Sequence, residues 1–396
     1  MRHRMPPLHS WSSALIATVV GFGGTIALVV QAFRTLGATV EQTGSAVTAL
    51  CLGIAIGSAA MSLKIRMPIV LAWSTPGAAL LAATTPGLLA WPAAIAVFMI
   101  AAVLMIVLGL VPALGRLASR IPGSIASAML AGVLLPFCLG AFKSGAEDTL
   151  LVAILVGVFI VARLRVPLYA LLLVLVAGIA LTLLRGNVSE VPPGALFGVL
   201  LPTMPAGDLR TIIGLAIPLF LVTLVSQNLP GLVVLRASGY EPKPGPLIVG
   251  TGALSLVLAP FGAHAVNLAA ITAALCTNPD AHPDPTKRWM VALILGGFYF
   301  LLGVFSPGLV RLFLALPHVV IAALTGLALI PSLIGAMENM LAAKDERDPA
   351  ILTFLATASG LALFGLGSAF WGLVIGFTAL AAKKLTSDFA SRFKRG

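Results

Sequence analysis

Residues 69–77 read IVLAWSTPG and interrupt the apolar run 68–84 with polar, proline and glycine residues. The part up to Trp73 is typical of an extended lead. Ser74 or Thr75 then stands at a helix cap position, with Pro76 at the first helical position. The first N–H groups of a helix have no partner within it. The pattern predicts a half-extended, half-helical segment with free backbone N–H groups near Thr75 and Gly77.

A second interrupted run, 260–276, carries the sequence FGAHAVN at residues 261–267. Gly262, His264, Ala265 and Asn267 place small and polar residues in its middle. Two helix N-termini that face one cavity attract an anion through unpaired N–H groups and positive dipole ends, without a fixed cation. We therefore expect an anion site between the two segments. The alternative is that these residues only let helices pack closely.

The composition excludes a soluble protein. Of the 396 residues, 59% are hydrophobic and 9% are charged, whereas a soluble domain carries about a quarter of charged residues. The formal net charge of +11 comes from basic residues that stand singly or in pairs, except for a C-terminal group. Such spacing indicates membrane topology rather than a nucleic-acid surface. The chain is predicted to be an all-α polytopic protein of the lipid bilayer.

The apolar runs predict fourteen spans, although hydropathy alone would also allow twelve. With a cytoplasmic N-terminus, the positive-inside rule is obeyed: of the 24 Lys and Arg residues, only Arg34, Lys143, Arg185, Arg210 and Arg311 fall outside. Both termini are then cytoplasmic, and the first run is a permanent span rather than a signal peptide. The predicted spans are 13–33, 43–63, 68–84, 92–113, 122–142, 149–162, 166–184, 211–235, 246–258, 260–276, 289–306, 317–337, 349–365 and 367–382.

The two halves of the chain share a sequence pattern at a constant offset. A repeat of seven spans, an odd number, must insert its second copy upside down, and inverted repeats with interrupted spans are typical of secondary transporters. The proline-containing loop 186–208 would join the halves. The repeated residues are Arg116, Leu117, Pro122, Ala128, Pro136, Gly140 and Ala141, which recur as Arg311, Leu312, Pro317, Ala323, Pro331, Gly335 and Ala336.

Few polar side chains are placed at membrane depth. Gln227 and Asn228 lie within the eighth predicted span, where unsatisfied amides are costly; they face a cavity or satisfy the backbone groups freed by Pro230. All 13 carboxylates fall in loops or at span ends. His264 is the titratable residue left in mid-span, so it is either a proton carrier or a hydrogen-bonded core residue. Trp73 either stacks on an aromatic substrate or packs.

Residues 278–288, NPDAHPDPTKR, bring His and Asp residues together. Their spacing is compatible with a metal site, but three prolines in an exposed loop favour a rigid turn. The three cysteines lie in apolar runs and show no paired spacing for zinc or a disulfide framework. We expect no metal, no cofactor and no catalytic residues.

Three motifs resemble those of the bacterial benzoate/proton symporter family (BenE type): AWSTPG at 72–77, SQNLPG at 226–231, and FGAHAVNLAAIT at 261–272, followed by AHPD at 281–284. The resemblance extends from the first span to about Lys384. It implies an inner-membrane carrier with the fold of the uracil permease and sulfate-carrier class. A core of residues 1–117 and 210–306 would move against a gate of residues 118–209 and 307–396. The chain lacks the intramembrane glutamates of uracil and xanthine permeases.

The resemblance and the residues together predict import of benzoate or a related aromatic carboxylate with protons, by alternating access. Backbone N–H groups near Thr75, Gly77, His264 and Ala265 would hold the carboxylate. Hydrogen bonds would come from Ser74, Gln227, Asn228 and Asn267, with Gly262 at the break and Trp73 against the ring. His264 or the carboxylate itself would carry the proton, and a homodimer through the gate is compatible with the fold. Alternatives are a carrier of sulfate, bicarbonate or a nucleobase, or an intramembrane enzyme.

Overall fold

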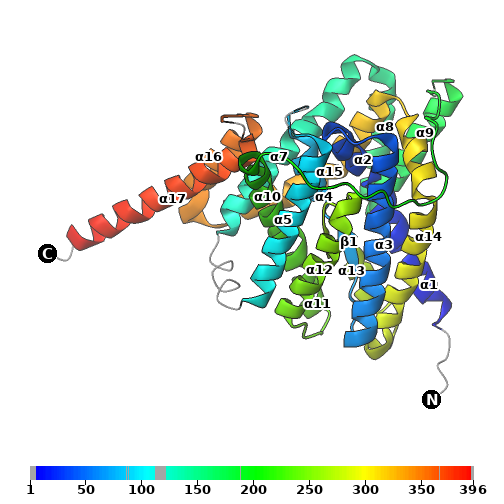
Figure 1. Ribbon diagram of the computed structural model, residues 1–396, viewed down its shortest axis with the longest axis horizontal. Coiled ribbons are helices and arrows are strands. Elements are labelled where there is room, and N and C mark those ends of the chain that lie inside the picture. Colours follow the sequence, from blue (N-terminus) through cyan, green and yellow to red (C-terminus); the bar gives the residue numbers. More distant parts are fainter. Residues whose placement is uncertain are drawn as a thin grey trace.

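The computed structural model describes residues 6–393 except 86, 88, 112–121, 188 and 365. Arg2, Arg4, Arg116, Leu117 and Arg120, the predicted boundary at 117/118, and the C-terminal Lys394 and Arg395 therefore lie outside the described residues. The chain folds into a helical bundle around a short two-stranded ribbon, and α17 projects from its side (Figure 1).

The helices and strands follow one another along the chain with several abrupt interruptions. They are α1 (Leu8–Gly23), α2 (Ile26–Thr35), α3 (Val40–Ile65), β1 (Leu71–Trp73), α4 (Thr75–Ala82), α5 (Trp91–Leu110), α7 (Gly123–Lys143), α8 (Thr149–Arg165), α9 (Ala170–Leu184), α10 (Leu209–Thr223), α11 (Leu229–Ala237), α12 (Pro244–Leu258), β2 (Val266–Leu268), α13 (Ile271–Thr277), α14 (Trp289–Leu314), α15 (His318–Ala342), α16 (Arg347–Ala358) and α17 (Ser368–Phe393).

The prediction of a helical membrane protein is confirmed. Among the described residues, nine helical segments are long and apolar enough to cross a bilayer, with the interrupted pairs α1–α2 and α10–α11 each counted as one segment. The remaining predicted spans correspond to shorter helices: α4, α8, α13, α16 and the apolar part of α17.

The third and tenth predicted spans meet in the ribbon. β1 and β2 are antiparallel, with Leu71 opposite Leu268 and Trp73 opposite Val266. Backbone groups away from water need hydrogen-bond partners, and serine side chains of the flanking helices provide them. Ser58 of α3 accepts from the Leu71 N–H, and Ser255 of α12 accepts from the Val266 N–H, both at 2.9 Å. These serines explain how extended backbone is tolerated inside the bundle.

The first predicted span, 13–33, is not a single helix. α1 ends at Gly23 and α2 starts at Ile26, with Thr25 between them in a non-helical conformation. Consecutive glycines weaken a helix. At Gly24 a side chain would also collide, because a Cβ atom there would lie 2.9 Å from the Val20 carbonyl oxygen. This break was not predicted from the sequence. It places the Thr25 hydroxyl against Trp73 at the end of β1.

The part of the joining loop at residues 189–208 runs over one end of the bundle, visible as the long green segment without helices in Figure 1. It is fixed by backbone hydrogen bonds to three helical segments: Gly198 to Val304, Thr203 to Pro260 and Ala206 to Pro92. These hydrogen bonds attach the loop to the bundle without regular structure.

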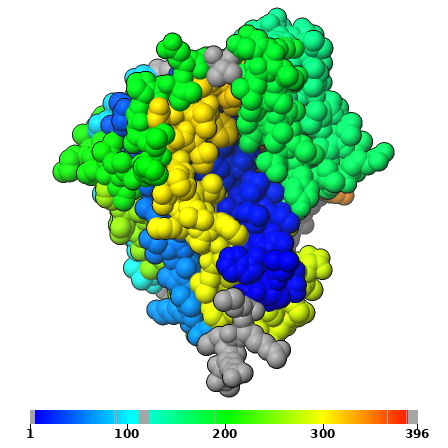
Figure 2. All heavy atoms as spheres, turned by 90° about the vertical axis from the view of Figure 1, so that its right-hand side faces the viewer, coloured from blue at the N-terminus to red at the C-terminus, as the bar shows by residue number. Residues whose placement is uncertain are grey.

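The bundle has two packing regions. The main core contains α3 packed along α14, α5 along α12, and α7 along α15. A smaller apolar cluster lies between α8, α9 and α15. On one face of the molecule, α1 (dark blue) lies beside α14 (yellow), with α8 and α9 (green) next to them (Figure 2).

Candidate functional site

A cavity of about 320 Å³ lies beside the ribbon, between the starts of α4 and α13 and the bend that precedes α11. Helices α7, α14 and α15 complete its walls. None of its lining residues carries a charge. They are Val20, Gly21, Thr25, Ala72, Trp73, Thr75, Pro76, Ser127, Leu130, Leu171, Val225, Ser226, Gln227, Pro230, Ala269, Ala270, Ile271, Thr272, Tyr299, Ala328, Pro331, Ser332, Gly335, Ala336 and Asn339.

The start of α4 forms one side of the cavity, as the sequence predicted. Ser74 is the N-cap, and its hydroxyl accepts a hydrogen bond from the Gly77 N–H at 2.9 Å. The Gly77 N–H is therefore already occupied. Thr75 is the first helical residue, and a helix has no internal partner for its first N–H groups. Thr75 and Pro76 face the cavity, so the positive end of the α4 dipole points at it.

The second helix start lies further along the chain than the sequence predicted. Residues 266–268 pair with β1 and remain extended, so α13 begins only at Ile271. Its N-cap residue, Ala270, offers no side-chain acceptor to the first N–H groups. Ile271 and Thr272 line the cavity, whereas His264 and Ala265 do not. The expected helix start near His264 was wrong because strand pairing, which is not visible in the sequence, shifts it.

An aromatic pair forms another wall. The Trp73 indole N–H donates to the Thr25 hydroxyl at 2.8 Å, and its ring meets Tyr299 edge-on at 6.3 Å between centroids. Tyr299 is 2% exposed, lines the cavity, and its hydroxyl has no hydrogen-bond partner among the described residues. A buried tyrosine hydroxyl normally has a partner, so this group is available to a ligand.

Tyr299 was not among the site residues predicted from the sequence. The signal was present but weak: Tyr299 is one of three tyrosines in the chain and stands in the middle of an apolar run. A glycine of α1 makes room for it. A Cβ atom at Gly21 would lie 2.6 Å from the Tyr299 hydroxyl and 3.1 Å from a methyl group of Thr272.

The bend between α10 and α11 is a π-helical turn, Leu224–Asn228, directly before Pro230. Such turns often mark functional sites. Ser226 and Gln227 line the cavity. Gln227 thus faces a cavity, which was one of the two alternatives for this pair. Asn228 is not among the lining residues, and its amide donates to the Thr223 carbonyl oxygen at 3.4 Å.

Asn228 and Asn267 connect the bend to the ribbon. The Asn228 amide donates to Asn267 Oδ1 at 2.9 Å, and its oxygen accepts from the Leu268 N–H at 3.1 Å. Both side chains are at most 2% exposed. The two asparagines fix the position of β2 behind the cavity, but neither of them lines the cavity.

His264 is a buried residue behind α4, with 1% of its surface exposed. Its Nε2 atom lies 3.0 Å from the Ser74 carbonyl oxygen. A carbonyl oxygen only accepts hydrogen bonds, so Nε2 carries the proton. Nδ1 has no partner among the described residues, and Phe33 and Phe98 contact the ring edge-on.

Of the ten residues that the sequence proposed for binding, three line the cavity: Trp73, Thr75 and Gln227. Five others take part in the supporting hydrogen bonds, namely Ser74, Gly77, Asn228, His264 and Asn267. Gly262 has a positive φ of 99° and closes the turn before β2. The opposite wall, with Ser127, Ser332 and Asn339 from α7 and α15, was missed. These residues stand in ordinary apolar runs, and only tertiary packing brings them to the site.

The 278–288 loop is a structural turn at the end of α13. Among the described residues no group of His, Cys, Asp and Glu could hold a metal ion. Arg288 is buried and donates to the carbonyl oxygens of His282 and Thr277, both at 2.8 Å. Its charge therefore lies at the C-terminus of α13, where a cation is favourable.

Nearly the whole chain is similar to one family of known proteins. Residues 6–382 match the family described as "Benzoate membrane transport protein" (BenE). The chain belongs to this family. It is 40% identical over 378 residues to the "Inner membrane protein YdcO" of Escherichia coli, covering 95% of this chain and 96% of that protein. It is 34% identical over 369 residues to the "Benzoate membrane transport protein" of Acinetobacter baylyi, covering 93% of each.

Solved structures show the same fold in more distant proteins. The transmembrane domain of the cyanobacterial bicarbonate transporter BicA superposes with a TM-score of 0.58 at 15% identity, covering 92% of this chain and 97% of that one. The murine anion transporter Slc26a9 in its inward-facing state superposes with a TM-score of 0.63 at 13% identity, covering 98% and 70%. This BenE family member is therefore a multi-pass membrane transporter and not an enzyme.

Proposed function

We propose that this BenE family member imports benzoate or a related aromatic carboxylate together with protons, by alternating access. One observation supports this substrate above all. The cavity combines the N-terminal end of α4 with an aromatic wall of Trp73 and Tyr299 and has no charged residue among those that line it. An uncharged site of this kind suits a substrate that brings one negative charge and one ring.

The carboxylate binds at the helix starts in this proposal. It accepts hydrogen bonds from the Thr75 N–H, from the first N–H groups of α13 at Ile271 and Thr272, and from the Tyr299 hydroxyl. Charge-assisted hydrogen bonds are stronger than neutral ones. The ring packs against Trp73, and Gln227 adds a hydrogen bond. Ser74, Asn228 and Asn267 hold these groups in place without touching the substrate.

Movement of two domains would expose the site alternately to each side. The core comprises residues 1–117 and 210–306, and the gate comprises 118–209 and 307–396. We propose fourteen spans in two inverted halves. Support comes from interruptions at corresponding places: the α1–α2 break matches the bend before α11, and β1–α4 matches β2–α13. Ser127, Ser332 and Asn339 of the gate meet the core across the cavity. Both termini are cytoplasmic and the protein lies in the inner membrane.

The proton has two candidate carriers. His264 is linked to the cavity through the Ser74 carbonyl, which it contacts at 3.0 Å, and Thr75 is the next residue. The substrate carboxylate is the second carrier, because a benzoate that binds as the neutral acid brings its own proton. The two routes differ in whether transport without His264 still follows the pH gradient.

Uptake of labelled benzoate into proteoliposomes with an imposed pH gradient tests this function. Accumulation should follow an inside-alkaline gradient and collapse when a protonophore is added. Excess unlabelled benzoate should compete, whereas sulfate, bicarbonate and uracil should not. If sulfate, bicarbonate or uracil reduced the uptake of the label and unlabelled benzoate did not, the cavity would be assigned to that solute instead. Benzoate uptake that does not depend on the imposed pH gradient would contradict proton symport.

A further inference from the structure

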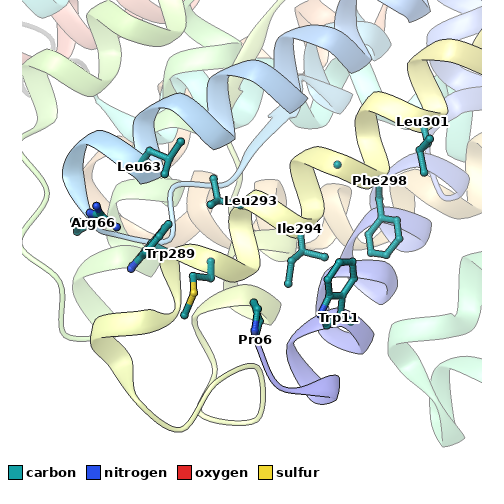
Figure 3. A pocket seen from close by; sticks show the side chains of 11 residues that line it. Pro6, Trp11, Leu63, Arg66, Trp289, Leu293, Ile294, Phe298 and Leu301 are labelled. Carbon is teal, nitrogen blue, oxygen red and sulfur yellow. The ribbon is translucent and has the colours of Figure 1, made fainter. Parts of the chain in front are cut away.

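A second, larger hollow lies on the outside of the bundle and plays no part in the transport site. This groove has a volume of about 760 Å³ and is formed by the C-terminal end of α3, the N-terminal half of α14 and the start of α1. Figure 3 shows its lining from Arg66 and Trp289 at one end to Leu301 at the other. α1 and α14 both lie on an outer face of the molecule (Figure 2).

One end of the groove carries a positive charge without a carboxylate partner. Arg66 caps α3 in a left-handed conformation, with a φ of 58°. Its guanidinium lies over the Trp289 ring, 4.4 Å from the centroid. No carboxylate of the described residues lies within 4.0 Å of it. The cation is thus held in place by the ring and free to bind an anion.

The rest of the groove is apolar. Trp11 meets Phe298 edge-on at 6.3 Å between ring centroids. Trp11 is 45% exposed and Leu301 is 54% exposed. Gly297 lies between the larger side chains, and a Cβ atom there would meet nothing within 4 Å. The missing side chain keeps the floor of the groove open.

The length of the groove matches one leaflet of a bilayer. Trp289 and Leu301 are twelve residues apart on one helix, which corresponds to about 18 Å at a rise of 1.5 Å per residue. The hydrocarbon core of a bilayer is about 30 Å thick, so the groove spans about half of it. Tryptophan residues are enriched at the membrane interface, and Trp289 stands at the charged end.

We propose that this groove binds one anionic phospholipid, with its phosphate on Arg66 and an acyl chain along α14 toward Leu301. Basic pockets between membrane helices bind anionic head groups in this way. A lipid fits better than a second copy of the chain. The groove has its single charge at one end, and its apolar part is about as long as one bilayer leaflet is thick.

Native mass spectrometry of the full-length protein in mild detergent tests the site. The protein is offered phosphatidylglycerol and phosphatidylcholine with identical acyl chains. The wild type should retain phosphatidylglycerol preferentially, and Arg66→Gln should reduce that preference about fivefold. Gly297→Leu should fill the groove and reduce retention of both lipids. The matched controls are Arg163→Gln and Gly157→Leu on α8, where a Cβ atom at Gly157 also meets nothing within 4 Å; both should behave as the wild type.

Four results would overturn the proposal. The first is an unchanged lipid preference in Arg66→Gln. The second is unchanged lipid retention in Gly297→Leu. The third is a dimer in the wild-type spectra that Gly297→Leu converts to a monomer, because the groove would then be an interface between two copies. Equal losses of lipid preference or retention in the α8 control variants would also contradict the assignment of the groove to a lipid.

Discussion

The indole N–H of Trp73 donates a hydrogen bond to the Thr25 hydroxyl at 2.8 Å, and this contact joins two interruptions of the helical bundle. Thr25 stands in the break between α1 and α2, and Trp73 ends β1. The Phe22 ring lies 5.5 Å from the Trp73 ring and supports it from α1. The break in the first span thus fixes the aromatic wall of the cavity.

Replacing Thr25 should weaken substrate binding. Thr25→Val keeps the shape of the side chain but removes the acceptor, so the buried Trp73 N–H loses its partner. A lost hydrogen bond of this kind costs about 1 kcal/mol, which corresponds to about a fivefold rise in the KM for benzoate. The measurement is initial uptake rate against benzoate concentration in proteoliposomes. Thr35→Val, at the end of α2 and away from the cavity, is the control. Equal KM values for the two variants would show that Trp73 needs no such anchor.

Tyr299→Phe removes one oxygen atom from the cavity wall. The Tyr299 hydroxyl has no partner within the described part of the chain, so its removal should leave the fold intact. If it donates to the carboxylate, benzoate affinity should fall about tenfold, as for the loss of a charge-assisted hydrogen bond.

The control is Tyr169→Phe, which changes a tyrosine outside the cavity. Binding of benzoate to the purified variants by isothermal titration calorimetry gives the comparison. A Tyr299→Phe protein with wild-type affinity would remove the hydroxyl from the site and leave only the ring as a wall.

The Asn228–Asn267 pair should contribute to stability as one unit. Either alanine variant leaves buried polar groups without a partner, at a cost of about 1–3 kcal/mol in unfolding free energy. Once one partner is gone, the second substitution should cost less. The double variant should therefore be more stable than the two single losses predict, by about 1 kcal/mol. Denaturant titration in mixed micelles measures all four proteins, and strictly additive losses would show that the two amides do not interact.

His264→Ala separates the two routes for the proton. If His264 carries it, the variant should lose accumulation driven by the pH gradient while still exchanging labelled for unlabelled benzoate. His264→Gln can still donate to the Ser74 carbonyl, and it should likewise keep the exchange and lose the accumulation. Accumulation at the wild-type level in both variants would assign the proton to the substrate carboxylate.

Asp284 should make the 278–288 loop sensitive to acid. Hydrogen bonds from the Thr286 hydroxyl, and next from Lys287, lower the pKa of the Asp284 carboxyl from its ordinary 3.8 to about 2. A lowered pKa in the folded state stabilises the protein above the ordinary pKa, and this contribution is lost as the pH falls toward the folded-state value. Asp284→Asn should therefore lower the melting temperature at neutral pH. The difference in melting temperature between Asp284→Asn and the wild type should shrink as the pH falls from 3.8 to about 2. A constant difference across this range would contradict the assignment.

The sequence predicted those features of the fold that depend on residues close together in the chain. The helix start at Ser74 or Thr75 followed from adjacent residues, and the structure places the cap at Ser74. The lengths of the apolar runs located most of the helices. The start of α13 could not be predicted in this way. Residues 266–268 are extended because they pair with β1, almost two hundred positions earlier in the chain, and this delays the helix to Ile271.

The wall opposite the ribbon shows the same limit. Ser332 and Asn339 stand on α15 among residues of ordinary helical pattern, and only the packing of α15 across the cavity gives them a role. His264 attracted attention as a lone titratable residue in mid-span. In the structure it contacts the back of α4 rather than the cavity, a distinction that depends on side-chain direction and not on position along the span.

The most direct test of the central claim is a structure of the protein with 4-iodobenzoate, in which the iodine atom marks the ligand. The account predicts one strong iodine signal inside the cavity, near Trp73, with the carboxylate directed toward Thr75 and the start of α13. An iodine signal confined to another hollow, such as the groove beside Arg66, would contradict it.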